Sequence, residues 1–255
     1  MPNPPRRTTR LTPSRLAGKR VLVTRAREDA GELEAKLRAA GAVPILAPAI
    51  EFGPPDDVSR AAAAVRDAAH YRWLVFTSVH GVDAFFAHAR VERGAARIAA
   101  IGEKTAARVA QYGAHVGLVA PEAIEESLAE ALLAASEPGD RILLFRAQAA
   151  RQALPVLLRA GRRSVDDVAA YATREVRDPA LADAARAAEI WTFTSGSTVR
   201  ALVANVPGAG ELAAGKLVAC IGPVTAETAR ACGLPVHVTA TAHDVDGLIA
   251  ALECA

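Results

Sequence analysis

Short apolar runs in this sequence are followed, again and again, by hydroxyl side chains or an arginine. Two runs lead into the same Phe-Thr-Ser triplet, which ends at Ser78 and at Ser195, and two others end at Arg25 and Arg146. Hydroxyls and backbone N–H groups at the start of a helix form a cradle for anions. Such residues indicate a site for a ligand with many carboxylates. Their other interpretation is structural, since serine and threonine commonly cap helices.

Familiar catalytic motifs do not account for these residues. The sequence has no GxGxxG, no GxSxG and no HExxH, so a dinucleotide fingerprint, a hydrolase elbow and a zinc helix are not supported. Residues 210–216 (GELAAGK) match part of a phosphate-binding loop, but Leu217 replaces the required Ser or Thr and the segment precedes a strand. His80 is expected to be a capping or solvent-facing residue. Cofactor-free chemistry or binding without chemistry therefore remains.

The acidic pairs of the chain are interpreted as solvated helix ends. Examples are Glu125–Glu126 and Asp166–Asp167.

Three pairs of segments repeat at nearly one spacing. Residues 18–26 (GKRVLVTRA) match 139–147 (GDRILLFRA), the two Phe-Thr-Ser triplets match each other, and 101–106 (IGEKTA) match 221–226 (IGPVTA). The offsets are 121, 117 and 120 residues. Two copies at one spacing indicate two homologous domains and exclude a solenoid.

Each copy alternates apolar strands with amphipathic helices, and several of the helices are closed by glycine. Strands that are apolar throughout are typical of parallel sheets covered by helices on both faces. The predicted fold class is therefore α/β, with two similar flavodoxin-like lobes joined by a two-stranded linker. The expected strands are 20–24, 43–46, 73–77, 99–101, 190–194 and 217–221, and the expected helices are 28–40, 81–88, 105–111, 199–204 and 226–231.

The order of the matched segments predicts interleaved domains. The first strand unit belongs with the last two, so residues 18–50 and 178–255 are expected to form one lobe and residues 56–168 the other. The segments 51–55 and 169–177 would then be the linker strands. Two linkers between two lobes imply a hinge and a cleft.

Composition narrows the class of protein. Of 255 residues, 51% are apolar and 4% aromatic, which provides a core but few rings for stacking on nucleic-acid bases. Residues 1–17 carry four arginines and no acid, so the remaining chain has a net charge of −2, unlike a nucleic-acid binder. We predict a disordered basic tail over 1–17, and a transit peptide, which is also rich in arginine and poor in acids, is the alternative. Three unpaired cysteines and the lack of an 18-residue apolar run favour a cytoplasmic protein with no membrane partner.

Several segments together resemble the uroporphyrinogen-III synthase family. They are TRA at 24–26, the first FTS with Gly81–Val82, VAAYATREV at 168–176, FTSGSTVRAL at 193–202 and IGPVTAETARACGLPVHVTA at 221–240. The resemblance covers nearly all of 18–253. It implies a lyase of tetrapyrrole biosynthesis that closes linear hydroxymethylbilane to uroporphyrinogen III, with loss of water, inversion of ring D and no metal or cofactor.

The resemblance also implies roles for individual residues. Tyr171 matches the family's linker tyrosine, which would assist departure of the hydroxyl, and a phenol with an ordinary pKa of about 10 can donate a proton at neutral pH. Substrate carboxylates would be held around Ser78, Thr105, Ser195 and Thr225, with Arg25, Arg146 and Lys216 nearby. The chain departs from the family at His80, where Asn is more frequent before the glycine. A monomer is expected, with transient contact to the preceding enzyme of the pathway.

Two other function classes compete with this interpretation. A two-lobed binding or regulatory protein would keep the fold without the reaction, because fold does not fix function. A nucleotide-dependent enzyme on a doubly wound sheet is disfavoured by the missing glycine fingerprint.

Overall fold

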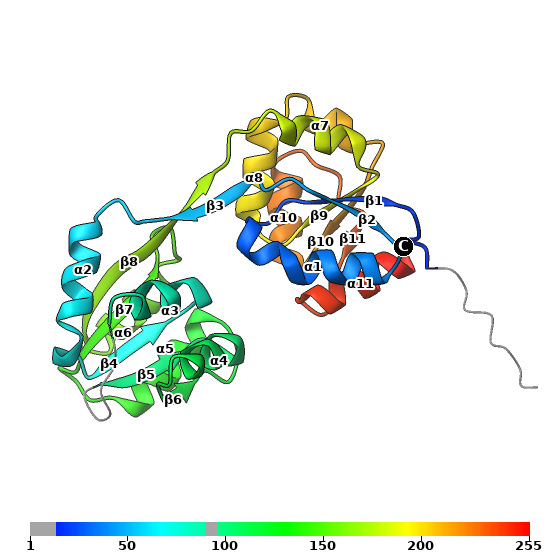
Figure 1. Cartoon of the computed structure of the whole chain (residues 1–255). Helices are drawn as coiled ribbons and strands as arrows, with labels where there is room; N and C mark the ends of the chain where they lie inside the picture. The colour runs from blue at the N-terminus through cyan, green and yellow to red at the C-terminus, as the bar shows by residue number, and fades with distance from the viewer. Residues whose placement is uncertain (1–13, 90–95) are drawn as a thin grey trace, which may run out of the picture. The chain divides into compact units, whose positions relative to one another are not determined.

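A computed structural model of the chain describes residues 14–89 and 96–255, and these divide into two compact units (Figure 1). Unit 1 consists of Met1–Glu51 and Glu175–Ala255, and unit 2 is Phe52–Arg174. The chain thus changes unit at 51/52 and 174/175, within the segments 51–55 and 169–177 that the sequence suggests as linkers.

Unit 1 is built on a five-stranded sheet in the order β11-β10-β9-β1-β2, and all its pairings are parallel. Helices cover both faces. On one face, α1 and α11 lie side by side (Figure 1), and Leu33, Leu37 and Leu248 pack there on Val21 and Val23. The other face is covered by α7, α8 and α10. The strands are β1 (Arg20–Val23), β2 (Val43–Leu46), β9 (Ile190–Phe193), β10 (Leu217–Cys220) and β11 (Val238–Thr239), and the helices are α1 (Arg27–Ala39), α7 (Ala180–Ala187), α8 (Gly196–Asn205), α9 (Ala209–Ala213), α10 (Pro223–Ala231) and α11 (Val245–Cys254).

Unit 2 carries a six-stranded sheet in the order β3-β8-β7-β4-β5-β6. Its α2, α3 and α4 pack on one face, around Phe76, Phe85 and Phe145, while α5 and α6 pack on the other, around Trp73 and Leu144. The strands are β3 (Ile50–Gly53), β4 (Trp73–Phe76), β5 (Arg97–Ala100), β6 (Val116–Val119), β7 (Arg141–Ala147) and β8 (Ser164–Glu175), and the helices are α2 (Val58–Arg66), the 3-10 turn η1 (Ala68–His70), α3 (Val79–Phe86), α4 (Glu103–Gln111), α5 (Glu125–Ala135) and α6 (Ala153–Ala160).

The two sheets share one strand order once the repeats are aligned. The sequence matches place β1 with β7, β9 with β4 and β10 with β5. The order β2-β1-β9-β10-β11 then corresponds to β8-β7-β4-β5-β6, with β3 added at the edge of unit 2. Continuous burial of strands such as β4 and β9 explains this parallel, two-sided packing. The predicted α/β class is confirmed.

The structure corrects two boundaries of the sequence analysis. The boundary expected at residue 168 falls inside β8, because one continuous strand forms both the last strand of unit 2 and its continuation into unit 1. The prediction of a disordered tail is wrong for residues 14–17. Leu16 is only 1% exposed and packs in the core of unit 1, and Ser14 hydrogen-bonds Glu253. Residues 1–13 of the predicted tail lie outside the described part.

No helix within residues 14–89 and 96–255 is long and apolar enough to cross a membrane.

Candidate functional site

In unit 1, three of the predicted binding residues follow adjacent strands of the sheet. Arg25 follows β1, Ser195 follows β9, and Thr225 lies in the first turn of α10, after β10. Because the carboxyl ends of parallel strands share one edge, these residues belong to the same edge of this sheet. Ser195 caps α8 and accepts a hydrogen bond from the Thr198 N–H at 3.4 Å. The Arg25 side chain is 18% exposed and lies 3.8 Å from the Asp29 carboxylate.

Unit 2 repeats this arrangement at its own sheet. Ser78 follows β4 and caps α3, where its hydroxyl accepts a hydrogen bond from the Gly81 N–H at 3.1 Å. Thr105 lies in the first turn of α4, after the adjacent strand β5. The capping interpretation of Ser78 and Ser195 is therefore confirmed, and their place at helix starts next to N–H donors also suits an anion.

Thr105 and Thr225 are more deeply buried than Ser78 and Ser195. Thr105 and Thr225 are each only 5% exposed. Glu103 and Lys104, on the same helix turn as Thr105, are exposed. A ligand approaching this turn therefore meets Glu103 and Lys104 before it meets the buried threonine.

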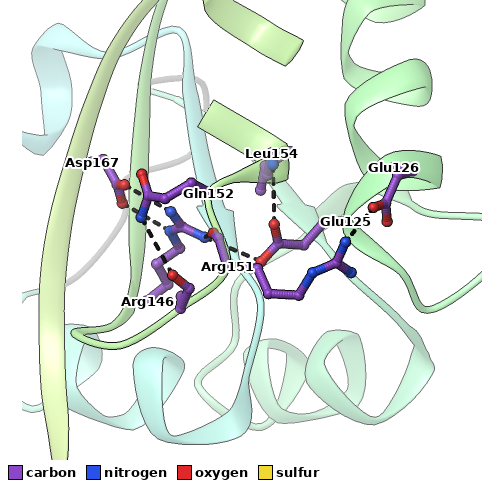
Figure 2. Close-up of polar contacts among 8 residues, drawn as sticks. Glu125, Glu126, Arg146, Arg151, Gln152, Leu154 and Asp167 are labelled. Carbon is purple, nitrogen blue, oxygen red and sulfur yellow. Dashed lines mark hydrogen bonds and ion pairs between the residues drawn. The ribbon is translucent and has the colours of Figure 1, made fainter. Parts of the chain in front are cut away.

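Arg146 is occupied by contacts within its own unit. Its side chain is 1% exposed, and the guanidinium donates to both Asp167 carboxylate oxygens at 2.8 and 2.7 Å and to Glu125 at 3.1 Å (Figure 2). It also donates to the Arg151 carbonyl, and Glu125 accepts in turn from the Leu154 N–H at 3.0 Å. These contacts argue against Arg146 as a substrate ligand and give it a structural role.

The same network corrects the interpretation of the acidic pairs. Glu125 begins α5 but is a buried partner of Arg146, not a solvated helix end. Asp166 and Asp167 lie within β8, where successive side chains point to opposite faces of the sheet. Asp167 binds Arg146 on one side, and Asp166 accepts a hydrogen bond from the Tyr71 hydroxyl at 2.7 Å on the other.

Lys216 is separated from the other candidates of its unit. It lies directly before β10, at the amino end of the strand, whereas Ser195 and Thr225 follow the carboxyl ends. Its ammonium group donates to the carbonyls of Arg186 and Ala188 at 2.7 and 2.6 Å, at the end of α7. A cation there stabilises the negative end of the helix, which is a structural role.

Tyr171 owes its direction to a β-bulge. In β8, Ala169 pairs with Arg146 and Tyr171 pairs with Ala147, so Ala170 is an extra residue relative to β7. A bulge shifts the alternation of side chains, and as a result both Ala170 and Tyr171 pack on the α2–α3 side of the sheet. Without the bulge, Tyr171 would point to the face of Asp167.

A cavity of about 620 Å³ lies on that side of the sheet, wholly within unit 2. Its walls come from α2 and α3, and its floor from β7 and β8. The loop that leads into α2 is fixed by Gln148, which accepts from the Asp56 N–H at 2.9 Å and donates to the Asp56 carboxylate at 2.6 Å. The lining residues are Phe52, Gly53, Pro54, Pro55, Val58, Ala61, Ala62, Val65, Arg66, His80, Ala84, His88, Phe145, Ala170 and Tyr171.

Three rings meet at this cavity. The His80 and Phe52 ring centroids are 3.9 Å apart, and Tyr171 lies edge-on to both, at 5.5 Å from His80 and 5.6 Å from Phe52. Ser78, and not His80, caps α3, and the partly exposed His80 lines the cavity. Sequence reasoning missed Phe52 and the lining residues of α2 altogether. The single available signal was Pro54–Pro55, which the sequence analysis assigned to a linker.

Among the described residues, no three His, Cys, Asp or Glu side chains converge as metal ligands.

Comparison with known proteins decides the family. The model of the uroporphyrinogen-III synthase HemD family matches residues 31–250. The chain belongs to this family. Uroporphyrinogen-III synthases are lyases of porphyrin biosynthesis with a tetrapyrrole substrate, as the sequence resemblance implies.

Individual relatives agree with this assignment. The chain is 32% identical to the uroporphyrinogen-III synthase of Synechococcus elongatus over 93% of this chain and 96% of that protein. It is 28% identical to the porphyrin biosynthesis protein HemD of Ruminiclostridium josui, over 92% of this chain and 48% of the longer relative.

Solved structures of uroporphyrinogen-III synthases share the two-lobed fold. A mutant enzyme from Thermus thermophilus matches with a TM-score of 0.62 at 18% identity, over 91% of this chain and 96% of that one. The Helicobacter pylori enzyme matches with a TM-score of 0.63 at 15% identity, over 91% and 97% of the two chains.

Proposed function

We propose that the chain converts linear hydroxymethylbilane to uroporphyrinogen III and that Tyr171 is its catalytic residue. The observation that carries the assignment to this residue is its position. Tyr171 follows a bulge that turns its side chain to the cavity of unit 2, beside Phe52 and His80. This site contains a donor group within an apolar surround, as expected for a reaction that excludes water.

In the proposed reaction, Tyr171 donates a hydrogen bond or a proton to the hydroxyl that leaves the linear tetrapyrrole. An electron-rich pyrrole expels this group readily, so little acid assistance is required. The larger task is to hold the chain so that the substituted end of ring D attacks ring A. Positioning therefore supplies most of the rate enhancement.

Substrate carboxylates are proposed to bind the helix starts at the sheet edges. Ser78 and Ser195 lie there, with Arg25 near the latter, and Thr105 and Thr225 mark the neighbouring helix turns. Arg25 supports this role because its only described ion pair is long, at 3.8 Å, and its side chain is partly exposed. Arg146 and Lys216 are excluded from the proposed binding set because internal contacts already occupy their charged groups.

The assay for this proposal supplies fresh hydroxymethylbilane and separates the oxidised products by isomer. Type III uroporphyrin above the protein-free control supports the synthase. The type I isomer alone, which forms spontaneously, would favour a two-lobed binding protein instead.

Tyr171→Phe tests the catalytic role. It should lower kcat by about ten- to a hundredfold without abolishing turnover, because general acid catalysis typically contributes about 10²–10⁴-fold and a group that leaves readily needs no more than the lower end of that range. Tyr112→Phe is the matched control. Its hydroxyl hydrogen-bonds Asp83 at 3.0 Å, and its ring stacks on Phe86, outside the cavity lining. A kcat for Tyr171→Phe equal to that of the control would remove Tyr171 from the reaction.

The monomeric state, transient contact with the preceding pathway enzyme and a cytoplasmic location are also proposals. Three thiols without a disulfide support a reducing compartment. Size-exclusion chromatography with light scattering tests the monomer.

A further inference from the structure

The cavity of unit 2 is a groove between two helices. On α3, His80 and Ala84 are spaced by four residues, and His88 follows four residues later, just beyond the helix end. On α2, the lining residues run from Val58 to Arg66, the whole length of the helix. Eight residues of helix span about 12 Å, so the groove is elongated along these helices.

The two ends of the groove differ in chemistry. Phe52, His80 and Tyr171 lie at the end where both helices begin. Arg66 is the last residue of α2, and His88 follows the end of α3, so both lie at the opposite end of the groove. Both residues are exposed. Between the ends, the floor is apolar and includes Phe145.

The ionisable side chains in the described groove lining, apart from Tyr171, are all basic. Among the residues that the structure describes, its lining contains one arginine and two histidines and no aspartate or glutamate. An apolar surround with a few convergent polar groups is typical of a small-molecule site, and 620 Å³ lies within the usual range for one. The complementary ligand is a flat, electron-rich ring that bears anionic arms.

We infer that this groove binds one pyrrole ring of the substrate, with the ring against Phe52 and His80 and its carboxylate arms directed to Arg66 and His88. The substrate class rests on the proposed function, whereas the location and the residues follow from the groove itself. Arg66, His80 and His88 thereby become binding residues in addition to those of the sheet edges. Seating the ring there also brings it next to the Tyr171 phenol.

The first experiment measures binding without turnover. A synthetic pyrrole with one acetate and one propionate arm is titrated into the full chain, labelled with ¹³C at the six histidine rings, at constant pH. The signals of His80 and His88 should shift with saturation, while that of His237 in unit 1, which lies beside Val218 near the amino end of β10, should not. Shifts confined to other histidines, or no shifts, would overturn the proposal.

Single substitutions then test whether the groove, and not another part of the protein, binds the pyrrole. Arg66→Gln should weaken pyrrole binding and raise KM by about fivefold with kcat little changed, because an exposed ion pair is lost. Arg72→Gln, an exposed arginine outside the lining, is the control. Ala62→Phe should fill the groove and raise KM further, whereas Ala69→Phe, at another exposed alanine, should not.

The outcomes distinguish the two proposals. If the wild-type chain forms the type III isomer but Arg66→Gln and Ala62→Phe behave like their controls, the groove proposal is wrong and the proposed function stands. If the pyrrole shifts His80 and His88 but no type III isomer forms, the groove proposal is supported and the proposed function is wrong.

Discussion

Arg25 and Arg146 occupy the same place in the repeated motif, at the penultimate position of GKRVLVTRA in unit 1 and GDRILLFRA in unit 2. Their surroundings differ. Arg146 is 1% exposed and is held by two carboxylates, whereas Arg25 is 18% exposed and faces one carboxylate at 3.8 Å. One motif therefore yields a structural arginine in one unit and an accessible one in the other.

The preceding residue of the motif differs as well. Thr24 is fully buried and donates to the Thr192 carbonyl at 3.1 Å, which ties β1 to β9. Phe145, at the equivalent place, lines the groove of unit 2. The repeat preserves strand order and helix starts, and the side chains of each unit then decide between packing and binding. Function thus has to be argued from each unit's contacts, not from the motif they share.

The largest difference in stability loss between the units should appear when Arg25 and Arg146 are substituted. Arg146→Met leaves Glu125 and Asp167 without their cation and should destabilise unit 2 by about 3–5 kcal/mol. Arg25→Met should cost unit 1 less than about 1 kcal/mol. Each unit has one tryptophan, Trp73 in unit 2 and Trp191 in unit 1, so urea unfolding followed in single-tryptophan backgrounds reads the units separately.

Adding Glu125→Gln and Asp167→Asn to Arg146→Met should restore part of the lost stability, because the uncompensated charges are then gone. Equal losses for Arg25→Met and Arg146→Met would mean that the burial of Arg146 does not make it structural.

A smaller difference in stability loss between the units is expected for substitutions at the start of the helices that follow the Phe-Thr-Ser triplets. Gly81 in unit 2 corresponds to Thr198 in unit 1. A Cβ at Gly81 would approach the Phe145 carbonyl oxygen to 2.7 Å, so Gly81→Ala should destabilise unit 2 by about 2 kcal/mol. Thr198→Ala loses a hydrogen bond to the Ser195 carbonyl, 2.8 Å long, and should cost about 1 kcal/mol.

The control for Gly81→Ala is Gly31→Ala in α1, where a Cβ would meet no atom within 4 Å. Alanine is the better helix former, so this change should stabilise unit 1 by roughly 0.5–1 kcal/mol. A stabilising effect of Gly81→Ala under the same conditions would contradict the close packing of α3 on β7.

Much of the framework is local in origin and could be predicted. Buried strands such as 73–76, a serine cap such as Ser78, and a glycine such as Gly113, which closes α4 at a φ of +77°, carry their signals within a few residues. The interleaving of the two domains along the chain is also predicted by the repeats. These features require no knowledge of distant contacts.

The site was predictable only in part because its decisive features depend on distant partners. The burial of Arg146 is set by Asp167 and Glu125, each 21 residues away, and the bulge at Ala170 arises from the register between two strands. Likewise, Leu16 is buried by a core whose other members extend to Leu252. A single sequence records the residue types but not these pairings.

The smallest effect concerns Asp166 in β8 and depends on pH. The hydrogen bond from Tyr71, followed by that from Arg141 at 3.1 Å, lowers the pKa of Asp166. Burial, and then the hydrogen bond to Asp166, raises the pKa of Tyr71 to about 12. Tyr71→Phe removes this pair and should destabilise unit 2 by at most about 1 kcal/mol at pH 7, since the Asp166 side chain is 44% exposed.

The difference in the free energy of unfolding between Tyr71→Phe and the wild type should shrink at both ends of the pH range. A carboxyl with a lowered folded pKa adds stability above its unfolded value of about 3.9 and loses it as the pH falls through the folded pKa. A phenol with a raised pKa adds stability below about pH 10 and loses it as the pH rises to about 12. Urea unfolding read at Trp73 should therefore show the largest gap between these limits, with no change at Trp191. A gap that stays constant from pH 3 to pH 7 would mean that Tyr71 stabilises unit 2 through packing and not through Asp166.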